Sequence, residues 1–455
     1  MIGQFSLSGI QAPLRGTLIG KDCSFDGVST DSRTITPGQL FVALKGENFD
    51  AGDFVSEAAK KGACAAVVSR PVELDIPRLQ VEDTLLALGQ LGSLNRSRSQ
   101  AGIAAVTGSQ GKTTVKEMLG AILAEAGETW VTRGNLNNAI GVPLSLLGLE
   151  QQHRFAVIEL GANAVGEIAY SVALVKPHVA VLTNATPTHL EGFGSLAGVV
   201  QGKGEIVEGL AEDGVAVLNA DDPHYLNWVN RAGRRRTVSF GCRNAEAQFR
   251  AIDPVIGKTG QVQFELRTPQ GSRMASLKLL GRHNAINAAA AAAAAVQMGV
   301  SLEAVISGLA RVRAVKGRMC LMTGREGATV IDDSYNASPS SFKAAIDLLA
   351  EFEGERLLIM GDMAEMGNES ASAHTEVGEY ARQRKINRLW ATGNLSRLAV
   401  NAFGSGGRLF SDQEALIGAC QDILGDSTTL LIKGSRSASM DKVADRLTIK
   451  EASPC

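Results

Sequence analysis

The sequence AAVTGSQGKTT, residues 104–114, decides how the rest of the chain is interpreted. Small and β-branched residues lead into a glycine turn, and the segment after Lys112 carries apolar residues at helical spacing. This order predicts a strand, a loop and a helix. Backbone N–H groups of such a loop, together with the positive end of the helix, form a concave site for anions.

The chemistry of the loop points to a nucleotide. Lys112 is expected at the β- and γ-phosphates, and the hydroxyl of Thr113 is expected to bind Mg²⁺. The strict phosphate-loop pattern needs a glycine five positions before Gly111, where this chain has Val106, so an ordinary glycine turn is the alternative. We expect ATP to contact the residues of the shorter loop: Gly108, Ser109, Gln110, Gly111, Lys112, Thr113 and Thr114.

Length and charge bound the class of protein. A chain of 455 residues can bury several cores, which predicts two to four domains. The 45 Lys and Arg residues balance 47 Asp and Glu residues, which argues against nucleic-acid binding and membrane insertion. The six cysteines form no C-x-x-C pair and are expected to be reduced thiols without a metal. We therefore expect a cytoplasmic protein.

Residues 1–100 are predicted to form a first α/β domain. The polar clusters that contain Ser32, Arg33 and Asp50 are either solvated loops or a pocket for an anionic group, with Arg33 and the hydroxyls as donors. The polar stretch 95–100 lacks periodicity and is interpreted as a linker into the next domain.

Residues 101–313 alternate strands and helices, which predicts a doubly wound, mostly parallel sheet. Glu159 ends a buried strand, where ligands bind in such sheets, although an acid there also serves as a helix cap. His189 follows another strand and is either a structural histidine or a metal ligand, and Lys203 alone suggests a surface charge. Asn284, before eight consecutive alanines, either caps a helix or contacts adenine.

Residues 314–455 restart the alternation and predict a C-terminal Rossmann-like domain. Its expected strands, 328–333, 357–362, 388–393 and 429–434, each end in polar or glycine residues, so one edge of this sheet is expected to carry chemistry.

Taken together, the motifs resemble those of the Mur ligases, the ATP-dependent amide-forming enzymes of peptidoglycan precursor synthesis. The resemblance covers nearly the whole chain. It rests on motifs in the family's order: TGSQGKTT (107–114), ELGAN (159–163), HLEGFG (189–194), HN (283–284), KGR (316–318) and DDSYN (332–336).

The resemblance implies a role for each motif. Lys112 would hold the ATP phosphates, Thr113 and Glu159 would bind Mg²⁺, and His189 a second magnesium positioned by a carbamylated Lys203. Asn284 would contact adenine, Arg318 the γ-phosphate, and Asp332 or Asp333 the ribose. The resemblance implies that catalysis depends on Lys112, Lys203, His189 and Arg318. It also implies a UDP-binding N-terminal domain that uses Ser32 and its neighbours.

Within the family, GNLNNAIGVP (134–143), DSYNASP (333–339), GDMAEMG (361–367) and KGSRS (433–437) favour the branch that adds D-Ala-D-Ala to UDP-MurNAc-tripeptide through an acyl phosphate. Such an enzyme is expected to be a monomer. Its substrates are expected at ten positions: Ser32, Arg33, Asp50, Asn135, Asn137, Asn138, Asn336, Lys433, Ser435 and Arg436. Ser338, where the family usually has Asn, and Asp53, where His is common, depart from the pattern.

Two alternatives remain at this level. Another ligase of the same architecture would add diaminopimelate or lysine, or would be a folylpolyglutamate synthase, and the stretches at 135–138 and 333–336 argue against both. A nucleotide-binding regulatory module would instead be expected to carry a guanine-reading N-K-x-D motif, which the sequence lacks.

Overall fold

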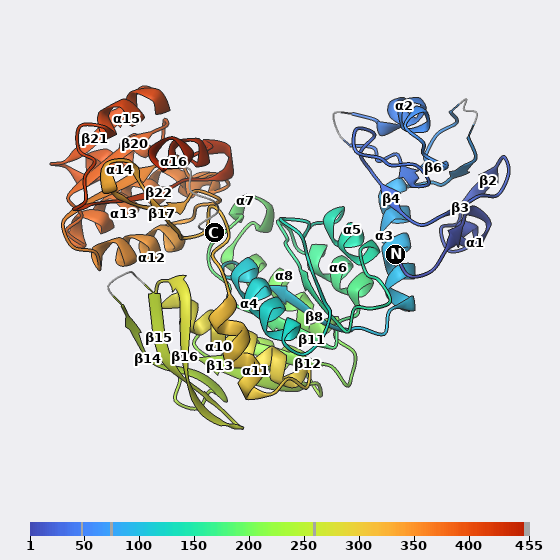
Figure 1. The fold of residues 1–455 in the computed structure, drawn as a ribbon, viewed down its shortest axis with the longest axis horizontal. Helices are drawn as coiled ribbons and strands as arrows, with labels where there is room; N and C mark the ends of the chain where they lie inside the picture. The colour runs from blue at the N-terminus through green and yellow to red at the C-terminus, as the bar shows by residue number, and fades with distance from the viewer. Residues whose placement is uncertain (47–48, 73–75, 258–260, 450–455) are drawn as a thin grey trace.

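The computed structural model describes residues 1–46, 49–72, 76–257 and 261–449, and it contains three α/β units, each built around its own main sheet. The units follow one another along the chain, and the central unit lies between the other two (Figure 1). The predicted α/β architecture with a mostly parallel central sheet is confirmed. The domain limits after residues 100 and 313 stay a prediction.

The N-terminal unit has a five-stranded sheet of order β2-β7-β6-β5-β4 and a small β1-β3 sheet. Its strands β5 and β6 are buried throughout, as their apolar sequences predict. The elements are β1 (Phe5–Ser6), α1 (Leu7–Gln11), β2 (Thr17–Ile19), β3 (Ser24–Phe25), β4 (Val28–Ser29), β5 (Leu40–Val42), η1 (Ala51–Phe54), α2 (Val55–Lys60), β6 (Ala65–Val68), β7 (Arg78–Gln80) and α3 (Thr84–Arg98).

Helix α3 shows that the predicted linker was wrong. Residues 95–98 form its last turn, and Asn95 is buried. The Asn95 side chain donates hydrogen bonds to the carbonyls of Leu146 (2.8 Å) and Leu149 (3.0 Å) and accepts one from the Ile2 amide (2.7 Å). Arg96 Nε donates to the Val175 carbonyl at 2.8 Å. These polar side chains fasten α3 to the central unit.

The central sheet has nine strands in the order β16-β15-β14-β13-β12-β11-β8-β10-β9. Within this order, the strands from β9 across β8 to β14 are parallel. Strands β14, β15 and β16 form an antiparallel extension at the other edge. Its strands are β8 (Gly102–Thr107), β9 (Thr129–Val131), β10 (Phe155–Glu159), β11 (Val179–Leu182), β12 (Val215–Asn219), β13 (Arg236–Gly241), β14 (Phe249–Ile256), β15 (Gln261–Thr268) and β16 (Gly271–Leu280). Its helices are α4 (Lys112–Ala124), α5 (Gly141–Leu147), α6 (Glu167–Val175), α7 (Leu190–Phe193), α8 (Leu196–Glu208), α9 (Tyr225–Ala232), α10 (His283–Gln297) and α11 (Leu302–Arg311).

Helix α10 explains the run of alanines. Ala288 to Ala295 are all fully buried, and the helix packs against α4 and against β13 and β14. A helix that is enclosed on every side has no polar face, and alanine combines close packing with the best helix propensity. The helix predicted from this run is confirmed, and it places its first residues beside the start of α4.

The C-terminal sheet has the order β17-β18-β22-β19-β20-β21, parallel except for β17. All four strands predicted here are confirmed. The elements are β17 (Cys320–Thr323), η2 (Arg325–Gly327), β18 (Thr329–Asp333), α12 (Pro339–Ala350), β19 (Glu355–Met360), η3 (Gly367–Glu369), α13 (Ser370–Gln383), β20 (Arg388–Thr392), α14 (Ser396–Phe403), β21 (Gly407–Phe410), α15 (Gln413–Cys420), β22 (Thr428–Lys433), η4 (Arg436–Ala438) and α16 (Asp441–Leu447).

The described cysteines divide into two kinds. Cys23, Cys64, Cys242 and Cys420 are free thiols, whereas Cys320 is disulfide-bonded, so the prediction of reduced thiols is wrong for that residue. Cys455 lies outside the described residues. No helix in the described ranges is long and apolar enough to cross a membrane.

Candidate active site

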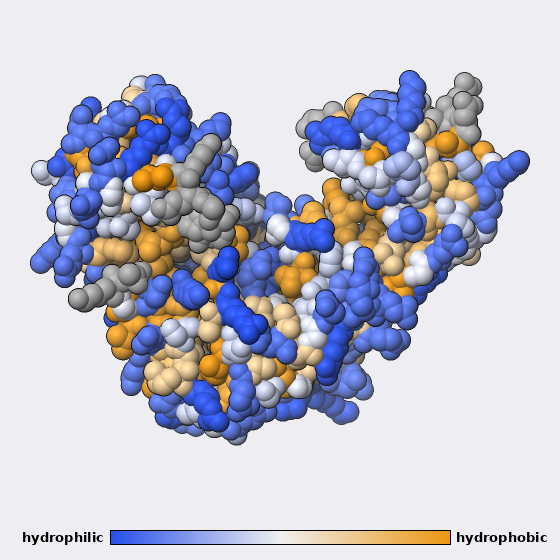
Figure 2. Space-filling view, viewed as in Figure 1, coloured by the Kyte–Doolittle hydropathy of each residue, from blue (hydrophilic) through white to orange (hydrophobic). Residues whose placement is uncertain are grey.

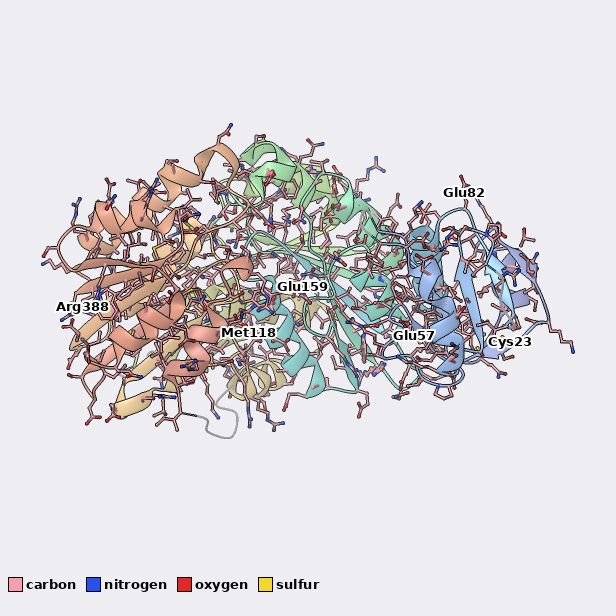
Figure 3. All side chains as sticks on the ribbon, turned by 90° about the horizontal axis from the view of Figure 1, so that it is seen from above. Cys23, Glu57, Glu82, Met118, Glu159 and Arg388 are labelled. Carbon is pink, nitrogen blue, oxygen red and sulfur yellow. The ribbon has the colours of Figure 1, made fainter. Side chains whose placement is uncertain are left out.

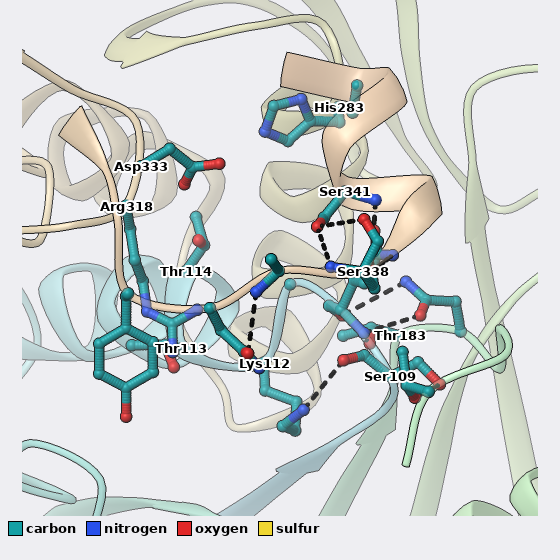
Figure 4. Close-up of a pocket in the computed structure, with 18 of the residues that line it drawn as sticks. Ser109, Lys112, Thr113, Thr114, Thr183, His283, Arg318, Asp333, Ser338 and Ser341 are labelled. Carbon is teal, nitrogen blue, oxygen red and sulfur yellow. Dashed lines mark hydrogen bonds between the residues drawn. The ribbon is translucent and has the colours of Figure 1, made fainter. Parts of the chain in front are cut away.

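The loop between β8 and α4 faces a cavity of about 280 Å³ between the central and C-terminal units (Figure 4). Residues 109–114 line it, and Gly108 and Gly111 shape it with φ of +147° and +77°. A Cβ at Gly108 would come within 1.9 Å of Thr183 Oγ1, and one at Gly111 within 2.6 Å of Asn287 Oδ1. Both positions therefore require glycine for space as well as for backbone conformation.

Lys112 lies over the loop that precedes it. Its Nζ donates hydrogen bonds to the carbonyls of Gly108 (2.7 Å) and Ser109 (3.1 Å). Burial, reinforced by the nearby Arg318 guanidinium, lowers the pKa of Lys112 to about 8, although the Glu159 carboxylate opposes the shift. The ammonium and the first amides of α4, which have no partner within the helix, make a site for phosphate.

The end of the neighbouring strand β11 holds the loop in shape. Ser109 N donates to the Asn184 carbonyl and Gln110 N donates to Asn184 Oδ1, both at 2.9 Å. Thr183 and Asn184 also line the cavity, and the sequence analysis did not select them. The available signal was that both polar residues follow a buried strand, at the edge where ligands bind in parallel sheets.

Glu159 ends β10 in the central unit, between the two flanking units (Figure 3). It is buried, and its Oε1 accepts a hydrogen bond from Asn137 Nδ2 at 2.7 Å. Its Oε2 has no hydrogen-bond partner among the described residues. A buried carboxylate oxygen without a donor suits a cation, and Thr113 supplies a hydroxyl in the cavity lining. Glu159 accepts no bond from a helix start, so the helix-cap alternative is not what the structure shows.

His189 and Lys203 lie near the loop as well. His189 has a positive φ of 53°, and its Nδ1 lies against the Glu365 carboxylate of the C-terminal unit. Burial lowers the pKa of His189, although Glu365 opposes the shift, so the two groups form an ion pair only when the imidazole is protonated. Lys203 is buried, not on the surface as its sequence context suggested, and its Nζ donates to the Ala162 carbonyl at 3.0 Å. Burial, with a smaller contribution from Lys112, lowers the pKa of Lys203 to about 7.

Asn284 lies at the start of α10 and lines the cavity. Its Nδ2 donates to the Leu280 carbonyl at 2.7 Å, and its Oδ1 accepts from Asn287 Nδ2 at 2.9 Å. The N-cap of α10 is Arg282 and makes no side-chain cap, so Asn284 is not a cap. Contact of Asn284 with adenine stays a prediction.

The C-terminal unit supplies a cation and an acid to the cavity. The Arg318 guanidinium lies 4.2 Å from the centre of the Tyr335 ring, and Asp333 Oδ2 pairs with Lys433 Nζ at 2.5 Å. Of the two aspartates predicted for ribose, only Asp333 lines the cavity. Asp332 is fully buried, accepts hydrogen bonds from Gly317 N (3.1 Å) and Ser334, and has a raised pKa because of burial.

The remaining substrate residues of this unit are divided by the structure. Asn336 lines the cavity, and its carbonyl accepts from Lys433 Nζ at 2.8 Å. Ser435 Oγ donates to the Asp362 carbonyl at 2.6 Å, and Arg436 is exposed. Neither Ser435 nor Arg436 belongs to the cavity lining.

The predicted substrate residues of the N-terminal unit lie away from the cavity, across the hollow that Figure 2 shows between the outer units. Ser32 is buried, and Arg33 is exposed and pairs with Asp31 at 2.8 Å. Asp50 caps η1 and pairs with Arg70. Asp53, which stands where the family commonly has His, also pairs with Arg70.

The asparagines after β9 lie outside the cavity as well. Asn135 is exposed, Asn137 contacts Glu159, and Asn138 Oδ1 accepts from Gly141 N at 2.9 Å at the start of α5. The other departure, Ser338, is the N-cap of α12 in a capping box with Ser341.

Comparison with known proteins identifies relatives over nearly the whole chain. Three family models match: the Mur ligase family catalytic domain at residues 24–131, the Mur ligase middle domain at 106–295, and the Mur ligase glutamate ligase domain at 317–436. The UDP-N-acetylmuramoyl-tripeptide--D-alanyl-D-alanine ligase of Escherichia coli is 47% identical over 97% of this chain and 98% of its own length. The protein of the same name from Haemophilus influenzae is 40% identical over 94% of this chain and 95% of its own.

Solved structures agree with these relatives. A crystal structure of MurF from Acinetobacter baumannii has a TM-score of 0.92 and 36% identity, covering 98% of this chain and 99% of its own. MurF from Thermotoga maritima in complex with ADP has a TM-score of 0.84 and 28% identity, covering 92% of this chain and 96% of its own.

Proposed function

The chain belongs to the Mur ligase family, and on this premise we propose that it joins D-Ala-D-Ala to UDP-MurNAc-tripeptide at the expense of ATP, in peptidoglycan precursor synthesis. The observation that carries the proposal is the shared cavity. The phosphate loop of the central unit faces Arg318, Asp333 and Asn336 of the C-terminal unit. A nucleotide held by the first unit is thereby presented to groups of the second.

The reaction activates a carboxylate that is otherwise a poor electrophile. The terminal carboxylate of the tripeptide attacks the γ-phosphorus of ATP, ADP leaves, and an acyl phosphate forms. The neutral amine of D-Ala-D-Ala attacks the carbonyl carbon of the acyl phosphate, its nitrogen loses a proton to solvent as the amide forms, and inorganic phosphate leaves with the bonding electron pair. Lys112 and Arg318 neutralise the phosphate charge, and enclosure between the units keeps water from the acyl phosphate.

Mg²⁺ fits the donors that the central unit offers. Thr113 and Glu159 would hold one ion and His189 a second. Glu159 Oε2 has no hydrogen-bond partner in the described part of the chain, which supports the first assignment. Bound there, Mg²⁺ supplies positive charge to the phosphates during transfer.

We propose that Lys203 is carbamylated. Carbamylation needs the neutral amine, whose nitrogen attacks the carbon of CO₂ and then loses a proton to give a carbamate. Because burial lowers the pKa of Lys203 to about 7, a large share of its amine is neutral near pH 7. The amine of an ordinary lysine is almost fully protonated at this pH. The carbamate would add negative charge near His189 and help place the second ion.

The other assignments follow the positions of the side chains. Adenine at Asn284 and ribose at Asp333 agree with the cavity lining. The dipeptide is assigned to Asn336, Lys433, Ser435 and Arg436, and the UDP end of the tripeptide to the N-terminal unit. We place the enzyme in the cytoplasm, where ATP and UDP-linked precursors are made, and expect a monomer.

A substrate-dependence assay tests the function. Phosphate release from ATP should require both UDP-MurNAc-tripeptide and D-Ala-D-Ala, and the product mass should equal that of the pentapeptide. Release with diaminopimelate or lysine and the dipeptide precursor in place of these substrates would assign the chain to another branch. Nucleotide binding without any amide product would indicate a regulatory module.

A further inference from the structure

The tip of the phosphate loop touches the C-terminal unit directly. Gln110 Nε2 donates a hydrogen bond to Ser338 Oγ at 3.3 Å and another to Ser340 Oγ, although these residues lie 228 and 230 positions away in sequence. Both serines belong to the start of α12, the helix that follows the cavity-lining residues Tyr335 and Asn336. The contact therefore joins the phosphate loop to the helix that follows the C-terminal residues of the cavity lining.

The backbone of Gln110 is held in place by hydrogen bonds to the residues after β11. Gln110 N donates to Asn184 Oδ1 at 2.9 Å, and the Gln110 carbonyl accepts from Thr183 Oγ1 (2.5 Å) and Asn184 Nδ2 (3.3 Å). Gly111 follows in a conformation that other residues rarely adopt. With the backbone held on both sides, the loop conformation determines where the amide points.

Of the two serines that accept from Gln110, Ser338 also caps helix α12, whereas Ser340 does not. Ser338 Oγ accepts from Ser341 N (3.3 Å), and Ser341 Oγ accepts from Ser338 N (2.9 Å), which closes the capping box. Ser340 Oγ takes no part in the cap. Within the described ranges its hydrogen bonds are to Gln110 and to Ser338 Oγ (3.4 Å).

We propose that Gln110 is a positioning residue that couples the phosphate loop to docking of the C-terminal unit, through the hydroxyls of Ser340 and Ser338. The loop shape that receives the nucleotide also aims the Gln110 amide at α12. This contact stabilises the closed arrangement, in which the cavity-lining residues of the C-terminal unit face the phosphates of the nucleotide. The inference rests on the proposed binding of ATP at the loop.

The consequence for catalysis falls on any substrate that binds only the closed arrangement. If D-Ala-D-Ala binds the closed arrangement, its apparent affinity is reduced in proportion to the closed fraction. One hydrogen bond exchanged for water changes such an equilibrium by about three- to tenfold. Chemistry within the closed complex keeps its geometry, so kcat should change little.

Two neighbouring variants separate this role from helix capping. Ser340→Ala removes the Ser340 acceptor of Gln110 and leaves the weaker bond to Ser338 and the capping box, whereas Ser341→Ala removes part of the cap and leaves Gln110 both acceptors. Each full-length protein is measured for KM of D-Ala-D-Ala, kcat and thermal midpoint. Small-angle X-ray scattering, with and without a non-hydrolysable ATP analogue and magnesium chloride, reports closure independently of activity.

We expect Ser340→Ala to raise the KM for D-Ala-D-Ala about three- to tenfold, to leave kcat and the thermal midpoint near wild type, and to compact less on binding the analogue. Ser341→Ala should lower the thermal midpoint and compact like the wild type on binding the analogue, because Gln110 keeps both of its acceptors. In a Gln110→Ala background, Ser340→Ala should add nothing, because the partner is already gone.

The inference is overturned if Ser340→Ala binds the analogue, compacts like the wild type and keeps its KM, or if the two substitutions multiply in the double variant. Failure of the wild type to bind the analogue would instead remove the proposed function, so the two failures are distinguishable.

Discussion

The N-terminal unit packs on the central unit through apolar side chains joined by the buried polar side chains of Asn95 and Arg96, whereas the C-terminal unit faces it across a cavity lined largely by polar residues. On the first side, Leu88 and Leu91 of α3 share a buried cluster with Leu147 of α5. Gly92 approaches so closely that a Cβ there would lie 2.9 Å from Pro143 Cα. On the second side, polar contacts such as Gln110 with Ser340 and His189 with Glu365 cross the boundary.

The difference has a thermodynamic meaning. Separating an apolar interface exposes its area to water at about 25 cal/mol per Å², so the N-terminal contact is expected to persist. Polar contacts exchange for hydrogen bonds to water at a net cost of only about 0.5–1.5 kcal/mol each. The chain therefore places its chemistry at the boundary that opens more easily. Substitutions on the polar side should affect activity, and those on the apolar side stability.

The largest effect is expected from Lys112→Ala. Loss of the ammonium from the loop should lower kcat by ~10²–10³-fold, corresponding to the ~3–4 kcal/mol typical of a lost transition-state donor. The urea midpoint should stay near wild type, since among the described residues the Lys112 ammonium donates hydrogen bonds only to carbonyls of its own loop. Phosphate release with both substrates present measures the rate, and the exposed Lys278→Ala is the control. Near-normal turnover in Lys112→Ala would refute the assignment of the loop.

The next effect lies at the boundary of the N-terminal and central units, at the buried Asn95. Asn95→Ala leaves the Leu146 and Leu149 carbonyls and the Ile2 amide without this partner in a buried place. We expect a loss of about 2–3 kcal/mol in the free energy of unfolding, with the KM values retained. Urea denaturation measures the loss, and Asn230→Ala, at an exposed helical position, is the matched control. If Asn95→Ala were as stable as the wild type but inactive, the boundary with the N-terminal unit would serve activity and not stability, contrary to the comparison of the two boundaries.

Asn95 also shows where sequence reasoning ends. A polar residue that bonds to backbone carbonyls of a distant segment looks the same in sequence as a solvated one, so 95–100 was predicted to be a linker. Lys203 was misjudged from its context in the same way, until the family resemblance implied a role for it. Burial of a polar side chain depends on non-local packing, which apolar periodicity does not report.

What could be predicted depends on local patterns. The strands that end at Glu159 and Asp333 and the alanine helix follow from apolar runs and helix propensity. The roles of Thr183 and Asn184 depend on β11 lying beside β8, an order that the sequence does not state. The choice between Asp332 and Asp333 depends in turn on which carboxylate the turn at Gly317 and Ser334 takes up.

The pH dependence of nucleotide binding gives a third, smaller effect. Burial holds the pKa of free Lys112 at about 8, and a bound triphosphate favours the protonated form, which raises the pKa in the complex. Affinity is therefore full below about pH 8 and is lost as pH rises toward the pKa of the complex, by up to about tenfold per pH unit. Titration of a non-hydrolysable ATP analogue from pH 7 to 9.5 measures this.

Lys112→Arg is the matched variant, because arginine keeps its charge throughout this range. Its dissociation constant should be flat with pH, whatever its absolute value. Equal slopes in the two proteins would show that another group is responsible.

The smallest effect is expected at the contact between His189 and Glu365. Burial lowers the pKa of His189, so the two groups carry opposite charges only when the imidazole is protonated. The Glu365 side chain is 55% exposed, so even the charged pair contributes at most about 1 kcal/mol and is screened by salt. Glu365→Gln should raise the KM for D-Ala-D-Ala by about two- to fivefold at low ionic strength and by less at 0.5 M salt, while the urea midpoint stays unchanged. Glu369→Gln, in the short helix η3 that follows the Glu365 loop, is the control, since the structure gives its side chain no ion pair among the described residues. A fall in stability without any change in KM would mean that this polar boundary is as fixed as the apolar one, and the distinction between the two sides would be lost.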